Sequence, residues 1–365
     1  MRTTSASKWL PALVIGLASV TFVAFSLSAR NWEPRSFALI GRRFAQVDPA
    51  GNKGYDGQFA YYIATDPIGA ADNMDAAAYR YLRIVYPALA WVLSLGGRSD
   101  LAAWALIAIN VVALAALAAT VGELMARRAA SRWYGLVVPL TAGMLFSLRA
   151  DLNEPLALAL ALGAVMLIGE ANRHVGVGAV TLLALSALTK ETGYVYAGGV
   201  ALWLLLARQW RSAIGASLGA IGPSMVWGAL VSVWLGHSPF DTERTRFELL
   251  PFGGLRFTEP SEAQLILALW IVIPSIGLVL SLARHVRRGD RSLASILLGA
   301  NLLFVMFMPR ASYIDAMAVM RLSAGMMAAA LFWLAESNRR WLPYLAALWI
   351  PSGLLLLVLP GVLGG

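Results

Sequence analysis

The stretch LAAWALIAINVVALAALAATVG, residues 101–122, decides the fold class of this chain. None of its 22 residues carries a charge. A helix needs about 20 consecutive apolar residues to cross the hydrocarbon core of a bilayer. A strand of an outer-membrane barrel would instead alternate apolar and polar residues. The stretch therefore predicts a membrane-spanning helix.

The composition of the whole chain agrees with this prediction. Of its 365 residues, 59% are hydrophobic and 13% are charged, and the mean hydropathy is +0.68. A soluble domain has about 45–50% apolar and about 25% charged residues, and disorder requires low hydrophobicity, so both classes are excluded. The chain has no cysteine, which excludes disulfides, thiolate metal sites and cysteine nucleophiles. Its three histidines do not cluster, so the sequence supports no histidine metal site.

Ten further runs with few or no charges predict additional spans. They are Trp9–Ser28, Trp133–Leu148, Pro155–Gly169, Val175–Thr189, Gly193–Ala207, Ala213–Leu235, Ala263–Ala283, Ser292–Pro309, Ala316–Ala335 and Trp341–Pro360. We therefore expect an all-α polytopic membrane protein with about eleven spans, forming one transmembrane domain over residues 1–365. The first run resembles a signal peptide that ends at Ser28, but it is longer than a usual signal core, which favours an uncleaved anchor.

The arginines predict which loops face the cytoplasm. With a cytoplasmic N-terminus, the arginine-rich short loops all fall inside, as the positive-inside rule requires, and most acids fall outside. Residues 30–100 then form a long first outer loop, and residues 237–262 form a second one. The apolar segment Ile84–Leu95 of the first loop is too short to span, so we expect an interfacial or re-entrant helix.

The first outer loop contains an acid between two glycines, followed by aromatic residues. The segment Gly54–Tyr62 includes Tyr55, Asp56, Gln58, Tyr61 and Tyr62. Glycines allow a ligand to approach the backbone closely, and aromatic faces pack on sugar rings or acyl chains. A solvated turn followed by an interfacial aromatic belt is the alternative interpretation.

Two arginines follow in the same loop. Arg80 and Arg83 are three residues apart, so they share one face of a helix, and paired guanidiniums suit a phosphate. Snorkelling to lipid headgroups is the alternative.

Three further outer segments carry ionisable groups beside short apolar runs. Asp151, Asn153 and Glu154 precede Pro155, where a simple helix cap would also explain them. Lys190 and Glu191 either neutralise each other or serve a ligand, the lysine suiting a phosphate. Arg310 and Asp315 precede Arg321, which lies about two turns into an apolar run and must face a polar cavity or a partner. One topology places all of these groups on the outer side, which predicts an outward cavity with carboxylates and several cations.

This pattern resembles the GT-C superfamily of integral-membrane glycosyltransferases. Gly54–Tyr62, Tyr79–Pro87, Asn153–Pro155 and Leu188–Thr192 are similar to the outer motifs of a bacterial branch associated with cell-surface glycopolymers. The resemblance implies a helical bundle whose long first outer loop carries an essential acid and juxtamembrane helices. It also implies a location in the bacterial inner membrane, with the site on the periplasmic face.

The resemblance further implies an inverting transfer of a monosaccharide from a polyprenyl-phosphate donor to a lipid-linked or glycan acceptor. Asp56 would act as the general base. The cations that would bind the donor phosphate are Lys190 and Arg321, with Arg80, Arg83 and Arg310 in reserve. The residues that would bind the substrates are Tyr55, Gln58, Tyr61, Tyr62, Asp151, Asn153, Glu154, Glu191 and Asp315. Many GT-C enzymes carry an acidic pair that holds Mg²⁺ or Mn²⁺, but Gly57 and Gln58 follow Asp56 here, which leaves the use of a metal open.

Two other function classes remain open at this point. A flippase or transporter of lipid-linked sugars would also bury arginines and carboxylates, although the inner loops offer few acids and no inverted repeat is evident. A membrane acyltransferase would need a histidine-centred motif that the sequence lacks. The sequence shows no nucleotide-binding fingerprint and no pattern typical of a nucleic-acid partner.

Overall fold

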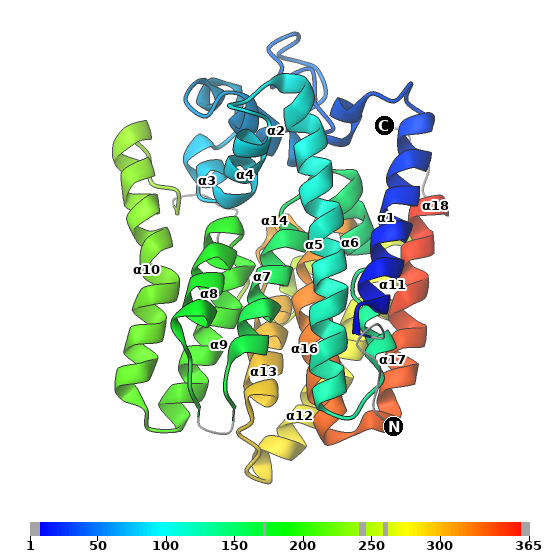
Figure 1. Ribbon diagram of the computed structural model, residues 1–365, viewed down its shortest axis with the longest axis vertical. Helices are drawn as coiled ribbons and strands as arrows, with labels where there is room; N and C mark the ends of the chain where they lie inside the picture. The colour runs from blue at the N-terminus through cyan, green and yellow to red at the C-terminus, as the bar shows by residue number, and fades with distance from the viewer. Residues whose placement is uncertain (1–7, 171–172, 241–245, 258–261, 359–365) are drawn as a thin grey trace.

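The computed structural model describes residues 8–170, 173–240, 246–257 and 262–358. In these residues the chain is helical, with an isolated bridge between Gly169 and His174 and no β-strand. Figure 1 shows an elongated bundle whose helices run along one axis, with the segment between α1 and α5 forming a cap at one end. The predicted all-α class is therefore confirmed.

Five helices in the described residues are long and apolar enough to cross a membrane. They are α1 (Leu10–Ser28), α5 (Ser99–Arg127), α10 (Trp210–Leu235), the continuous helix Gln264–Arg287 and the pair α15–α16 within Ala316–Ser337. Four apolar helices are shorter: α7 (Glu154–Leu167), α8 (Val177–Thr189), α9 (Thr192–Leu206) and α13 (Leu293–Met306). The chain is thus a helical membrane protein by length and composition.

Two of the long spans are divided into several elements. The helix Gln264–Arg287 contains most of α11 (Glu262–Leu267) together with η7 (Ala268–Val272) and α12 (Ile273–Arg287), and the pair within Ala316–Ser337 is α15 (Ala316–Leu322) and α16 (Ala324–Ser337). The remaining elements are short: η2 (Pro34–Phe37), α2 (Gly57–Thr65), η3 (Gly69–Asn73), α3 (Ala77–Tyr81), α4 (Val85–Leu93), η4 (Arg132–Leu136), α6 (Ala142–Arg149), η6 (Gly253–Phe257), α14 (Arg310–Tyr313), η8 (Arg339–Trp341), α17 (Leu342–Trp349), η9 (Ile350–Leu354) and α18 (Leu355–Val358).

Two of the expected spans are not single helices. The run Trp133–Leu148 divides into η4 and α6, and Pro139, which has no amide hydrogen, lies between them. The run Trp341–Pro360 passes from α17 through the 3₁₀ turns of η9, where Pro351 lies, into α18. An apolar run shows that a segment is buried or faces lipid, but it does not show whether one helix continues through a proline.

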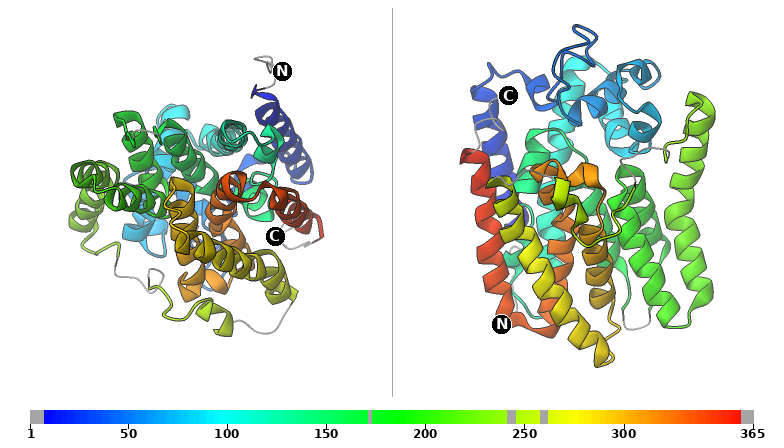
Figure 2. Two further views of the ribbon diagram at one scale, coloured as in Figure 1. Left: turned by 90° about the horizontal axis from the view of Figure 1, so that it is seen from below. Right: turned by 180° about the vertical axis from the view of Figure 1, so that it is seen from behind.

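The helices pack around α5 and α16. Helix α5 contacts α1, α4 and α7, while α13 contacts α9 and α16. Helix α16 is buried along almost its whole length, and Trp333 within it is fully enclosed. Helix α10, by contrast, lies at the edge of the bundle (Figure 2) and exposes apolar side chains such as Val233, which is 85% exposed. Such a surface suits hydrocarbon as its surroundings.

The two ends of the bundle differ in charge. The loops after α5, α9, α12 and α16 carry arginine pairs and lie at the end opposite the cap (Figure 1). At that end Arg128 binds both Glu170 and Glu336, which joins the ends of three helices. The cap contains α2, α3 and α4, and α4 matches the short helix expected within Ile84–Leu95. Within the second outer loop, residues 241–245 and 258–261 lie outside the described part of the chain.

Candidate functional site

Asp56 lies at the start of α2, on a segment that is held on two sides. The backbone N–H of Tyr55 donates to the carbonyl of Leu39 at 3.0 Å. The side chain of Gln58 accepts from the N–H of Gly41 at 3.1 Å and donates to the carbonyl of Lys53 at 2.7 Å. Gly57 is so close to the next segment that a Cβ would lie 2.0 Å from the carbonyl oxygen of Ala150. The segment around Asp56 is therefore docked into the bundle.

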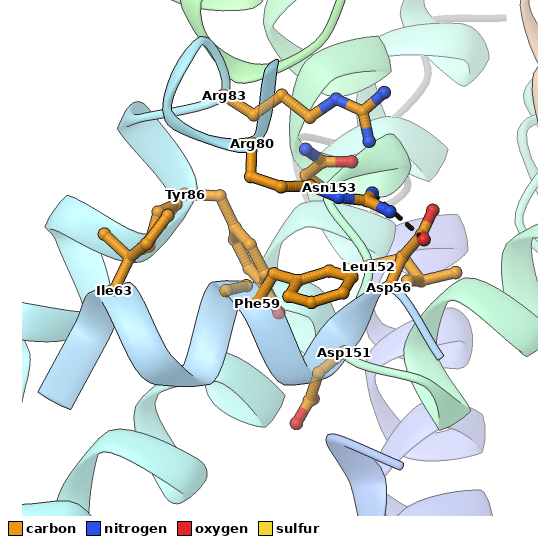
Figure 3. A pocket seen from close by; sticks show the side chains of 11 residues that line it. Asp56, Phe59, Ile63, Arg80, Arg83, Tyr86, Asp151, Leu152 and Asn153 are labelled. Atoms are coloured by element: carbon orange, nitrogen blue, oxygen red, sulfur yellow. Dashed lines mark ion pairs between the residues drawn. The ribbon is translucent and has the colours of Figure 1, made fainter. Parts of the chain in front are cut away.

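The Asp56 carboxylate pairs with two guanidiniums from distant parts of the chain. Its Oδ1 lies 3.0 Å from Nη1 of Arg80, and its Oδ2 lies 3.3 Å from Nη2 of Arg321; Figure 3 shows the pair with Arg80. The side chain of Asp56 is 29% exposed, compared with 7% for each arginine. Burial raises the pKa of Asp56, but Arg80 and Arg321 outweigh this and hold it well below its ordinary value.

Arg80 is fixed by a second acid that the sequence analysis did not select. Its Nε and Nη2 donate to the two oxygens of Asp75 at 2.9 and 3.0 Å, the two-point geometry that orients a guanidinium best. Its guanidinium also lies 4.2 Å from the ring centre of Phe59. In the sequence, the sign of this ion pair is that Asp75 lies five residues before Arg80.

Glu154 joins Arg321 to a third cation, Lys190. Its Oε1 lies 2.7 Å from Nζ of Lys190 and 2.8 Å from Nη1 of Arg321. Lys190 also lies 3.4 Å from the side-chain oxygen of Asn153, whose amide donates to the carbonyl of Thr189 at 2.8 Å. Burial and the nearby Arg83 lower the pKa of Lys190, in the turn between α8 and α9, to about 8. The Asn153 side chain makes no capping hydrogen bond to α7, so a helix cap does not explain it, and both Asn153 and Glu154 contact Lys190 instead.

Arg83 forms the fourth cationic element. Its Nε donates to the two oxygens of Glu191 at 2.9 and 3.2 Å, and its Nη2 contacts the hydroxyl of Tyr79. Lys190 and Glu191 are neighbours in the sequence, yet their ion pairs are with Glu154 and Arg83. The alternative that Lys190 and Glu191 merely neutralise each other is therefore wrong.

Apart from Asn153 and Glu154, these groups line a cavity of about 780 Å³, within the size range of small-molecule sites. One part of its wall is charged and contains Asp56, Arg80, Arg83, Lys190, Glu191 and Arg321. Another part is apolar or aromatic and contains Tyr194, Val195, Phe240, Phe247 and Phe304. The cavity is thus suited to a molecule with an anionic or polar part and an apolar part.

Tyr55 and Asp315 lie on the same wall as Arg321. The Tyr55 hydroxyl donates to Asp315, and the Arg321 guanidinium lies 5.3 Å from the centre of the Tyr55 ring. The other oxygen of Asp315 accepts from the N–H of Met317 at 2.9 Å and so caps α15, the helix that carries Arg321. Asp315 thus connects the Tyr55 side chain to the backbone at the start of α15.

Several predicted ligand-binding residues lie elsewhere. Tyr61 and Tyr62 pack with Tyr86 and the apolar residues of α4 and α5 and do not line the cavity, whereas Phe59 of the same helix does. Gln58 reaches the cavity wall, but its side-chain oxygen and nitrogen each make a hydrogen bond that holds the loop. Arg310 is exposed at the start of α14 and is not part of the cavity wall.

Asp151 is buried behind the site. Its carboxylate points away from Asp56 (Figure 3), across a small cavity of about 30 Å³ that both residues line. Burial raises its pKa well above the ordinary value, and the nearby Arg149 offsets this only in part. Arg149 donates to the carbonyl of Ser36 at 2.9 Å. Arg149 therefore holds the loop that contains Ser36, both carboxylate oxygens of Asp151 are buried without a hydrogen-bond partner among the described residues, and neither residue lines the large cavity.

Within the residues that the structure describes, no group of three or more His, Asp or Glu side chains could hold a metal ion. The acids of the cavity are instead paired with arginine and lysine.

No protein-family model, no curated protein and no solved structure matches this chain. The function must therefore be inferred from the geometry of the cavity.

Proposed function

We propose that this protein is a glycosyltransferase that moves a monosaccharide from a polyprenyl-phosphate donor to a lipid-linked or cell-surface glycan acceptor. The single observation that carries the proposal is the position of Asp56 on the wall of the 780 Å³ cavity, at ion-pair distance from Arg80 and Arg321. A carboxylate beside several cations is the combination that this reaction needs, because one group must accept a proton while others stabilise a leaving phosphate.

The reaction is a single displacement at the anomeric carbon of the donor sugar. The acceptor hydroxyl gives its proton to the Asp56 carboxylate, and its oxygen forms the new bond to that carbon. The bond from the carbon to the lipid-phosphate oxygen breaks, and the electron pair leaves with the phosphate. One displacement inverts the configuration at the carbon.

The cations of the wall support binding of the phosphate. Arg80, Arg83, Lys190 and Arg321 all line the cavity and are fixed by carboxylates, so their positions are set before a ligand enters. Fixed cations stabilise developing negative charge without reorganisation during the reaction. Arginine also offers the planar donor pair that matches phosphate oxygens.

The apolar part of the wall supports a lipid tail. Tyr194 and Val195 lie on α9, Phe304 lies on α13, and Phe240 and Phe247 come from the segment after α10. A prenyl chain can pack on these faces while its phosphate meets the cations. The GT-C resemblance of the sequence agrees with this arrangement.

The proposal includes the orientation in the membrane. We place the arginine-rich end in the bacterial cytoplasm, following the positive-inside rule, and the cavity on the periplasmic side. The eleven apolar runs, two of them interrupted, would supply the transmembrane bundle.

The test is sugar transfer by the purified protein in detergent, where no gradient exists. A synthetic prenyl-phosphate sugar and a panel of glycan acceptors are supplied, and the glycosylated product and the released prenyl phosphate are measured. We expect both products in equal amounts. If the protein forms no glycoside in this assay but moves a lipid-linked sugar across the membrane of vesicles, it is a flippase.

A further inference from the structure

The charged groups that surround Asp56 are balanced before any ligand enters. The four cations Arg80, Arg83, Lys190 and Arg321 are matched by the four acids Asp56, Asp75, Glu154 and Glu191. Each cation lies at ion-pair distance from at least one of these acids. A phosphate that binds the cations must therefore compete with a carboxylate already in place.

The acids differ in how firmly they are held. Glu191 is the paired acid of Arg83, and Glu154 is the paired acid of Lys190, so the loss of either leaves a buried cation without its carboxylate. Asp75 makes two hydrogen bonds to Arg80. Asp56 makes one contact with each of two arginines, and both arginines have a second acid, Asp75 or Glu154. Asp56 is therefore the acid whose departure disturbs the remaining pairs least.

We propose that the phosphate of the lipid-linked donor displaces Asp56 from Arg80 and Arg321, and that this displacement frees the carboxylate to accept the proton of the acceptor. The inference rests on the proposed function and adds an order of events to it. Asp75 and Glu154 act as positioning residues, because they hold Arg80 and Arg321 in place while the phosphate replaces Asp56 as the second partner of each.

The displacement explains how Asp56 can act as a base although two arginines hold its carboxylate. A carboxylate held by two guanidiniums is a poor proton acceptor, because both cations stabilise its charged form. When the phosphate takes over the guanidiniums, a negative group replaces two positive contacts and the basicity of Asp56 rises. The donor must then bind before the acceptor can react, because Asp56 is a poor base until a lipid phosphate occupies the two arginines.

Binding of a prenyl phosphate without sugar tests the displacement independently of transfer. A synthetic prenyl phosphate is titrated into the purified protein in detergent, with the corresponding prenyl alcohol as the ligand that lacks the phosphate. Asp56→Asn removes the competing charge, so it should bind the prenyl phosphate on the order of tenfold more tightly than the unaltered protein. It should bind the alcohol with unchanged affinity.

Asp72→Asn is the matched control. Asp72 is exposed in the same outer loop and is not part of the cavity wall, so this variant makes the same change in charge at a distance from the site. Its affinity should stay within about twofold of the unaltered protein. Asp56→Ala is measured beside Asp56→Asn as a second variant, and size-exclusion chromatography confirms that each variant is folded.

The outcomes separate the two proposals. If the unaltered protein binds prenyl phosphate and both Asp56 variants bind it equally or more weakly, the displacement is overturned while the proposed function stands. An equal increase in Asp72→Asn also overturns the displacement, because the effect is then one of net charge. If neither the unaltered protein nor the variants bind prenyl phosphate, the proposed function fails and the displacement fails with it.

Discussion

Lys190 and Arg321 bind the same oxygen atom of Glu154, at 2.7 and 2.8 Å. Glu154 begins α7, Lys190 ends α8 and Arg321 lies in α15, so one atom connects three segments of the bundle. All three side chains are at most 7% exposed. The positions of Lys190 and Arg321 therefore depend on one shared, buried carboxylate.

Replacing Glu154 by glutamine should destabilise the protein by about 3–5 kcal/mol, because removal of one partner leaves buried charge unpaired. Lys190 would keep only the contact with Asn153, while Arg321 would keep Asp56. The measurement is thermal unfolding in detergent followed by circular dichroism. Adding Lys190→Met to Glu154→Gln removes the unpaired ammonium and should recover part of the loss. If the double variant is less stable than Glu154→Gln, this explanation is wrong.

Asp56→Asn should lower the transfer rate by about 10²–10⁴-fold, the contribution typical of a general base. The amide keeps the size of the side chain, so expression and unfolding temperature should change little. Product formation under saturating donor and acceptor is the measurement, with Asp72→Asn as the charge-matched variant. Near-normal turnover of Asp56→Asn would exclude Asp56 as the base.

The value of kcat/KM for the donor should fall as pH rises through about 8. Burial lowers the pKa of Lys190 to about this value, and the ammonium form of Lys190 would bind the phosphate. Lys190→Arg keeps its charge at this pH, and the fall should disappear.

The stability of the fold should change with pH in the opposite direction. The folded protein releases this proton at about 8 and the unfolded chain near 10.5, so between these values the unfolded state binds more protons and stability rises with pH. A profile that is identical for both proteins would refute the role of Lys190.

Gly57→Ala should reduce activity strongly and lower stability by about 1–3 kcal/mol, as overpacking does. The added methyl would lie 2.0 Å from the carbonyl oxygen of Ala150, and the docked segment that carries Asp56 would have to move. Gly198→Ala, inside α9, is the matched control, because a Cβ there meets no atom within 4 Å. Alanine should be neutral or slightly stabilising at that position. Equal effects of the two substitutions would show that the segment is not docked as described.

The absence of native cysteine allows a direct test of the orientation. Ala50→Cys places a thiol in the exposed cap, and Ser212→Cys places one at the exposed start of α10, at the opposite end. A membrane-impermeant maleimide should label Ala50→Cys in bacteria whose periplasm is accessible, and Ser212→Cys only after the inner membrane is permeabilised. The reverse pattern would place the cavity in the cytoplasm.

The sequence predicted the helical class and much of the cavity for physical reasons that can be traced. Apolar runs must be buried or face lipid, so the helices followed from them directly. An arginine within an apolar run needs a polar neighbour, so Arg321 was a sound candidate, and it does meet Asp56 and Glu154. The expected shared side of Asp56, Lys190 and Arg321 corresponds to their common cavity.

What the sequence could not supply was the pairing of charges. Lys190 and Glu191 are adjacent, but their side chains form ion pairs with different partners. The packing of the helices determines which partner each side chain meets. Asp75 was not selected because an acid in an outer loop is ordinary until its distance to Arg80 is known. Tyr61 and Tyr62 were selected because they follow Asp56 in an aromatic segment, whereas the packing of α2 against α4 and α5 decides which aromatic lines the cavity.

The pairing of Arg83 with Glu191, and of Arg80 with Asp75, also has an evolutionary consequence. A substitution at one member of either pair leaves the other as an unpaired charge with little access to water. Only a second substitution, at the partner, restores the stability. Across descendants of this gene, the two members of each pair should therefore be retained together or exchanged together, and such correlated changes would be readable from sequences alone.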